Sequence, residues 1–160
     1  MDLSKYDISI CRTDGTKKYI YDEIRQREVL CTPEEIVRQK LLKYLIEELE
    51  VPKYMLDEEV ALTYYKIDSV RRPDILILKK DESKGEAVPL AVIECKRKGT
   101  LITKEIVEQT LFYADNLECD YAMITDGVIS DVAYFDSETE KYVSIEKLPK
   151  YQDMLEGKLG

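Results

Sequence analysis

Two acidic residues and a lysine stand where a buried β-sheet would not ordinarily carry charge. Asp74 follows a proline at the start of the apolar run Ile75–Leu78, and Glu94 and Lys96 close the apolar run Leu90–Ile93. Residues two apart on a strand project to the same face, so Glu94 and Lys96 would present an acid and an ammonium to one pocket. Asp74 on a neighbouring strand can join them there.

Two carboxylates held close together favour a divalent cation between them. At about 4 Å they repel by about 1 kcal/mol in water and by roughly 4 kcal/mol in a partly buried site. Oxygen ligands select Mg²⁺ or Mn²⁺. The chemistry that fits is phosphodiester hydrolysis, with Lys96 steadying the attacking water or the developing charge. Charges at strand ends are common, so neither Pro73-Asp74 nor Glu94-x-Lys96 alone is strong evidence for a site. The hypothesis depends on the occurrence of both motifs, in this order, on successive strands.

Composition narrows the chemistry further. The chain contains no histidine, which excludes Ser-His and Cys-His nucleophilic pairs, and its four cysteines show no CxxC spacing. Catalysis would therefore use carboxylates, lysines or a hard metal ion. The net charge of −9 argues against indiscriminate nucleic-acid binding, because affinity for a polyanion comes from cationic contacts. Any DNA contact should be local, or shared with partner subunits.

The elements that must position these residues can be placed from periodicity. The 160 residues suffice for one domain. Thr32 and Pro33 open a helix expected to run to Glu50, with acids in its first turn. Its apolar stripe consists of Val37, Leu41, Leu42, Leu45, Ile46 and Leu49.

Strands are expected on both sides of a second helix. Residues 103–117 have helical spacing, with Ile106, Val107, Thr110, Leu111 and Ala114 inward, and the strands before and after it imply a right-handed parallel crossover. Residues 1–30 form a lead-in, with a strand and an ordered arm within 17–30, residues 31–150 the domain, and residues 151–160 a tail. The predicted strands are Glu59–Tyr65, Arg72–Leu78, Leu90–Lys96, Tyr121–Thr125, Val132–Phe135 and Tyr142–Ile145.

Together these motifs resemble a known family. Pro73-Asp74 followed by Glu94-Cys95-Lys96 resembles the PD-(D/E)xK signature of restriction-endonuclease-like nucleases. The helix opening 33–39 is similar to the proline-acid-acid-x-x-Arg-Gln start of the N-terminal domain of type I restriction R subunits. Residues 109–113 match the QxxxY motif of one subgroup, and 123–127 resemble that domain's strand ending in a polar residue and glycine. The resemblance covers roughly residues 30–136.

The resemblance implies an α/β/α fold with a mixed central sheet and Mg²⁺-dependent DNA cleavage, for which Mn²⁺ can substitute. It implies a catalytic core of Asp74, Glu94 and Lys96, with the Cys95 backbone carbonyl among the metal ligands. An acid of the first helix often completes such sites. Glu35 is our choice and Glu34 an alternative, while both could simply stabilise the helix dipole.

The resemblance also assigns a role to Gln109 and Tyr113, which share one helix face and could hold a phosphate or orient Lys96. From spacing alone, Tyr113 could equally be a packed aromatic. Arg38 lies within the apolar stripe and should pair with a carboxylate or a phosphate. DNA contacts are expected from Arg38, Arg71, Arg72 and Arg97. The cationic group around the proposed site also includes Lys79, Lys80, Lys96, Lys98 and Lys104, although Lys79, Lys80 and Lys98 are better interpreted as solvated surface lysines.

The chain has no GxxxxGK[ST] loop, so we expect no ATP site and no translocation by this chain itself. The leading hypothesis is an endonuclease module, excised or free-standing, that cuts double-stranded DNA presented by motor, methyltransferase and specificity subunits. The alternatives are a catalytically silent docking module of the same fold and a tyrosine-rich interaction domain, although tyrosines such as Tyr64, Tyr121 and Tyr134 fit sheet positions. Without an apolar run long enough to span a membrane, the protein is expected to be cytoplasmic.

Overall fold

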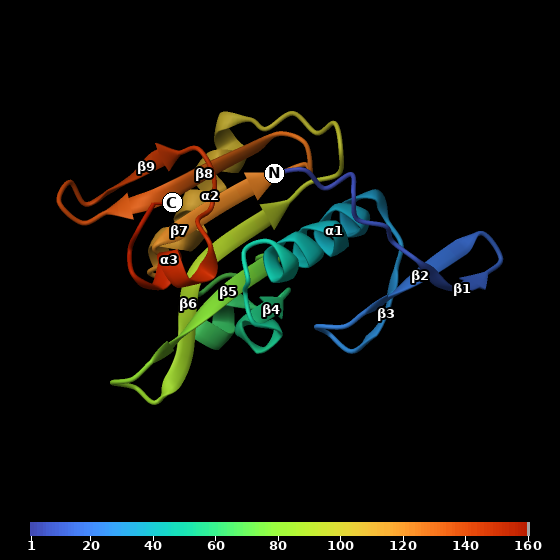
Figure 1. Cartoon of the computed structure of the whole chain (residues 1–160), viewed down its shortest axis with the longest axis horizontal. Coiled ribbons are helices and arrows are strands. Elements are labelled where there is room, and N and C mark those ends of the chain that lie inside the picture. The colour runs from blue at the N-terminus through green and yellow to red at the C-terminus, as the bar shows by residue number, and fades with distance from the viewer. Residues whose placement is uncertain (160) are drawn as a thin grey trace.

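A six-stranded mixed sheet forms the centre of the molecule (Figure 1). The computed structural model describes residues 1–159. The strand order is β4-β5-β6-β7-β8-β9, and β6 and β7 are parallel whereas the other neighbours are antiparallel. The six strands are β4 (Leu56–Glu58), β5 (Ile75–Asp81), β6 (Glu86–Cys95), β7 (Tyr121–Thr125), β8 (Ser130–Asp136) and β9 (Lys141–Ile145).

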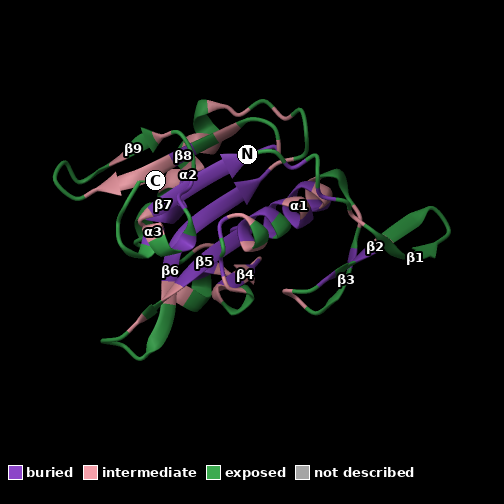
Figure 2. Cartoon of the chain, in the orientation of Figure 1, coloured by how far each residue is buried: buried purple, intermediate pink, exposed green. Residues whose placement is uncertain are grey.

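Helices cover both faces of this sheet and give it three layers. Helix α1 (Pro33–Glu47) packs on one face, where Leu41 and Leu45 join Ile75 and Ile93 in one buried cluster. Helix α2 (Lys104–Asn116) packs on the other face. The strands between them are buried on both sides, as the purple central arrows in Figure 2 show. The expected α/β nuclease-like fold is therefore confirmed.

Both helices begin after a threonine N-cap, of which the cap at Thr32 was predicted from the sequence. Thr32 and Thr103 are the N-cap residues, and their side chains accept hydrogen bonds from the backbone N–H groups of Glu35 and Ile106. The α1 helix ends at Glu47, three residues before the predicted end, and Glu50 has a left-handed backbone. Among the described residues, no helix is long and apolar enough to cross a membrane.

The predicted strand over 59–65 is wrong. The strand next to β5 is the preceding segment, β4, and Leu62–Tyr65 forms a short 3₁₀ helix. Left-handed backbone at Glu59 and Lys66 interrupts an extended conformation, and Tyr64 is 76% exposed instead of lying in the sheet. Burial of Leu62, not strand pairing, anchors this segment.

The first thirty residues form a separate antiparallel sheet instead of a strand and an arm. Strands β1 (Ile10–Asp14), β2 (Lys17–Asp22) and β3 (Arg27–Leu30) lie beside α1, away from the main sheet (Figure 1). Near the other terminus, the short helix α3 (Tyr151–Leu155) packs into the α1-side core, and Tyr151 Oη donates to the Leu78 carbonyl at 2.8 Å.

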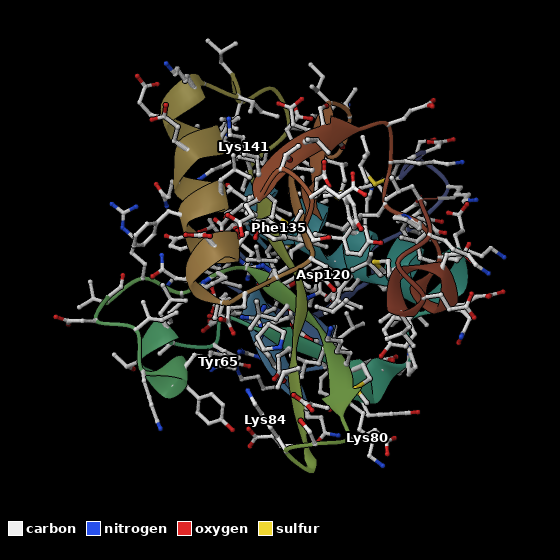
Figure 3. All side chains as sticks on the ribbon, turned by 90° about the vertical axis from the view of Figure 1, so that its left-hand side faces the viewer. Tyr65, Lys80, Lys84, Asp120, Phe135 and Lys141 are labelled. Atoms are coloured by element: carbon white, nitrogen blue, oxygen red, sulfur yellow. The ribbon has the colours of Figure 1, made fainter. Side chains whose placement is uncertain are left out.

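The hairpin that joins β5 and β6 carries cations far from the predicted site. Figure 3 shows Lys80 and Lys84 together at this hairpin, whereas Asp74 directly precedes the opposite end of β5. Lys79, also at the hairpin end of β5, lies 3.4 Å from the Asp120 carboxylate. Lys79 and Lys80 therefore lie away from the predicted site, in keeping with their interpretation as solvated surface lysines.

Candidate active site

Asp74 and Glu94 meet at the end of the β5–β6 pair. Ile75 and Ile93 are the last paired residues of this antiparallel ladder, so Asp74 and Glu94 are next in register. The Asp74 backbone N–H donates to Glu94 Oε1 at 3.3 Å, and the Cys95 backbone N–H donates to Asp74 Oδ2 at 2.8 Å. The residues are 6% and 7% exposed. The strands thus bring together the two carboxylates that the sequence paired.

Burial has an electrostatic consequence at Glu94. Removal of its carboxyl group from water raises its pKa, and the nearby Asp74 carboxylate raises it further, while Lys96 acts in the opposite direction. A carboxyl group in this state accepts a cation readily, because the cation offsets both the burial and the repulsion.

Arg38 supplies one such positive charge. Its guanidinium is 5% exposed, donates to Asp74 Oδ1 and lies 3.2 Å from Glu35 Oε1. It is also 3.4 Å from both Glu34 and Glu59. Arg38 was predicted to pair with a carboxylate or a phosphate, and in the structure it pairs with carboxylates.

The two acids at the start of α1 have different surroundings. Burial and the neighbouring Asp74 raise the pKa of Glu34, whereas Arg38 and Lys96 lower it, so Glu34 belongs electrostatically to the Asp74 site. The Glu35 carboxylate instead accepts hydrogen bonds from Arg25 and Arg38. Both acids thus lie in the charge network around Arg38, and the choice of Glu35 or Glu34 as a metal ligand stays a prediction.

Lys96 is held just beyond the end of β6. Its backbone N–H donates to the Thr125 carbonyl at 2.8 Å. The loop that follows is tied to the β7–β8 turn, because the buried Asp126 carboxylate accepts from Gly99 N–H at 3.0 Å. Asp126 also accepts from the N–H groups of residues 128 and 129 at 2.8 and 2.7 Å. Asp126 thus fixes the loop that carries Lys96, a role the sequence did not reveal.

Gln109 and Tyr113 form a hydrogen-bonded pair on α2. Gln109 Nε2 donates to Tyr113 Oη at 2.8 Å, and Tyr113 belongs to the buried cluster on the α2 side of the sheet that includes Val92 and Leu76. Since side chains alternate along β6, Glu94 projects to the same sheet face as Val92. The pair therefore lies on the face to which Glu94 points, as its expected role requires, although Tyr113 is also a core aromatic.

The predicted DNA-contacting arginines differ in accessibility. Arg71, Arg72 and Arg97 are exposed, unlike Arg38. Arg97 lines an open groove of about 590 Å³ together with Glu34, Arg38 and residues of the N-terminal sheet. Arg97 forms no ion pair with a carboxylate of the described residues, so it can reach a phosphate in this groove without first leaving such a partner.

Asp22, Arg25 and Glu58 were not singled out from the sequence, and the structure gathers them next to Glu35. No spacing distinguishes them, because acids occur throughout a chain that contains 33 Asp and Glu residues. Only the packing of the N-terminal sheet against α1 and β4 brings them together.

The donor set at the main site fits a hard divalent cation. Asp74 and Glu94 offer only carboxylate oxygens, and the Lys96 ammonium acts on Glu94 without competing as a ligand. The repulsion between the buried acids, expressed in the raised pKa of Glu94, is what such an ion would relieve.

A mixed sheet between helices, with acids and a lysine at one end of its central strands, defines an α/β nuclease-like protein. The family model for the type I restriction enzyme R protein N terminus (HSDR_N) matches residues 33–149. The chain belongs to this family, and the resemblance inferred from the motifs is confirmed. No curated protein matches the chain. Membership supports a nuclease-related role in a restriction system.

Proposed function

We propose that the chain is the metal-dependent DNA endonuclease module of a restriction system, acting on double-stranded DNA. The observation that carries the proposal is the meeting of Asp74 and Glu94 at the end of β5 and β6, beside Lys96. Asp74 and Glu94 would hold Mg²⁺, with Glu35 or Glu34 and the Cys95 backbone carbonyl as further predicted ligands. Bound there, the ion supplies Lewis-acid polarisation of the phosphate and a more acidic water.

The chain's own residues would orient the reaction. The Lys96 ammonium donates hydrogen bonds to a non-bridging phosphate oxygen or to the attacking water, and so steadies charge that develops there. Arg71, Arg72 and Arg97 bind flanking phosphates and fix the register of the backbone. The Gln109–Tyr113 pair orients the lysine or a phosphate from the α2 face.

Nicking of supercoiled plasmid tests the proposal. Lys96→Ala should fold normally, because the side chain is outside the core clusters, and should lose nicking when assembled with motor and specificity subunits. Lys98→Ala is the matched control: it changes an exposed lysine of the same loop and should keep nearly full activity. Wild-type nicking by Lys96→Ala would remove this lysine from the mechanism.

Metal binding gives an independent test. Calorimetry should show Mn²⁺ binding that is lost from this site in Asp74→Ala and in the Asp74→Ala, Glu94→Ala double variant. The site would be misplaced if the double variant bound Mn²⁺ with unchanged affinity and stoichiometry.

A catalytically silent docking module remains the second candidate, favoured by one specific observation. Both Asp74 carboxylate oxygens already accept hydrogen bonds, one from Arg38 and one from the Cys95 amide. An acid satisfied in this way can serve a purely structural purpose. The two candidates differ in the plasmid assay, since a docking module would produce no metal-dependent nicking in the complete assembly.

A further inference from the structure

A second group of carboxylates lies between the N-terminal sheet, α1 and β4. Asp22 is the last residue of β2, Glu35 is in the first turn of α1, and Glu58 is the last residue of β4. One oxygen from each lies within 4.8 Å of the others, and all three residues are buried. Arg38 stands between this cluster and Asp74, because it donates to Glu35 through Nη1 and to Asp74 through Nη2.

Glu58 is the unsatisfied member of this cluster. Its side chain is 0% exposed, and neither of its oxygens has a hydrogen-bond partner among the described residues. Arg25 Nε lies 3.5 Å from Glu58 but only 2.6 Å from Asp22, so the guanidinium is directed at the aspartate. A buried carboxylate without partners is strongly unfavourable, which indicates that something else meets it.

The charges around Glu58 are unbalanced. Arg25 contacts Asp22, Glu35 and Glu59 as well as Glu58, and the neighbouring Arg38 is shared with Asp74. Arg25 and Arg38 together face six carboxylates, which leaves an excess of negative charge that a divalent ion would reduce. The donors are all oxygens, and Gln39 donates to Asp22 at 2.9 Å, as expected of a group that orients a ligand.

We propose that Asp22, Glu35 and Glu58 bind a divalent cation of the Mg²⁺, Ca²⁺ or Mn²⁺ class at a site separate from Asp74 and Glu94. The three ligands come from three elements, so the ion fastens the N-terminal sheet and β4 to the start of α1. Its role is structural, and it acts on stability whether or not the chain cuts DNA. The competing occupant of Glu58 is a proton, because burial, then the hydrogen bond that a protonated Glu58 can donate to Asp22, and then repulsion from Asp22 raise its pKa to about 9.

Mn²⁺ titration of the full chain tests the proposal in a background that lacks the main site. The Asp74→Asn, Glu94→Gln double variant should bind one Mn²⁺, and addition of Glu58→Gln should abolish that binding. In the same double variant, Mn²⁺ at about 100-fold its Kd should raise the thermal midpoint by roughly 5–10 °C over EDTA, a shift that Glu58→Gln removes. Glu82→Gln, at an exposed hairpin acid, should change neither result.

Glutamine mimics a protonated glutamate, so Glu58→Gln also distinguishes a bound metal ion from a bound proton at Glu58. If Glu58→Gln leaves Mn²⁺ binding unchanged and raises the midpoint in EDTA, Glu58 holds a proton and the proposal is wrong. The proposal is equally overturned if the double variant binds no Mn²⁺, an outcome that does not depend on the folding of any Glu58 variant. Asp22→Asn provides a second route to the same loss of binding.

Discussion

Replacement of Arg38 by methionine should greatly lower the stability of the protein, although the substitution approximately preserves side-chain length. The guanidinium is buried and serves two acidic groups at once, Asp74 on one side and Glu35 on the other. At 3.2 Å and an effective dielectric constant of about 20, a single such pair is worth roughly 5 kcal/mol before desolvation. Removal of the cation leaves both carboxylates buried without it.

The net effect is smaller than the gross attraction. Arg38 is itself desolvated, and its Nε has no hydrogen-bond partner among the described residues, so the native state already bears part of that penalty. Loss of one partner from a buried ion pair typically destabilises by about 3–5 kcal/mol, and we expect Arg38→Met to fall in that range. Typical domains are stable by about 5–15 kcal/mol, so the variant should fold marginally.

Urea unfolding followed by circular dichroism measures this difference. The matched control is Lys53→Met, which removes an exposed cation 2.7 Å from Glu23 and should lose at most about 1 kcal/mol. Mn²⁺ should recover part of the loss in Arg38→Met, because a divalent ion can replace the missing charge beside Asp74. A loss in Arg38→Met no greater than that in Lys53→Met would refute the view that Arg38 balances the buried acids.

Three further substitutions have defined outcomes. Asp126→Ala should lower stability by about 2–3 kcal/mol in urea unfolding, because it leaves backbone N–H groups without their acceptor. Burial raises the pKa of Asp126, but the N–H groups that donate to its carboxylate lower it more, so the pKa lies below 3.8. The contribution of Asp126 to stability is therefore complete above that pH and declines as the pH falls further. A stability loss in Asp126→Ala that grew on acidification would contradict this. Tyr113→Phe removes only the hydroxyl that accepts from Gln109, so thermal melting should change little while plasmid nicking falls severely, and unchanged nicking would reduce Tyr113 to a core aromatic. Thr32→Ala should lower stability by about 1 kcal/mol through loss of the α1 cap, and an unchanged urea midpoint would show that the cap contributes nothing.

Local rules predicted the helices and the central strands. A threonine cap with three- and four-residue apolar spacing located α1, and apolar spacing located α2, to within a few residues, because capping and amphipathicity are properties of neighbouring residues. The strand predicted over 59–65 was wrong because local patterns do not determine which segments pair. Its β-forming residues satisfy the local pattern, but pairing with β5 was taken by Leu56–Glu58, which local propensity cannot foresee.

The sequence by itself indicated the family, the order of the central elements and the candidate set Asp74, Glu94 and Lys96, since strand alternation follows from spacing along the chain. Only the tertiary structure decided which charges meet. It placed Arg38 against Asp74, moved the hairpin lysines away from the site, and separated Glu34 from its neighbour Glu35. The same folding gathered Asp22 and Glu58 around Arg25. The physical reason is that charge pairing depends on distances of a few ångströms between segments far apart in sequence, and no local pattern encodes those distances.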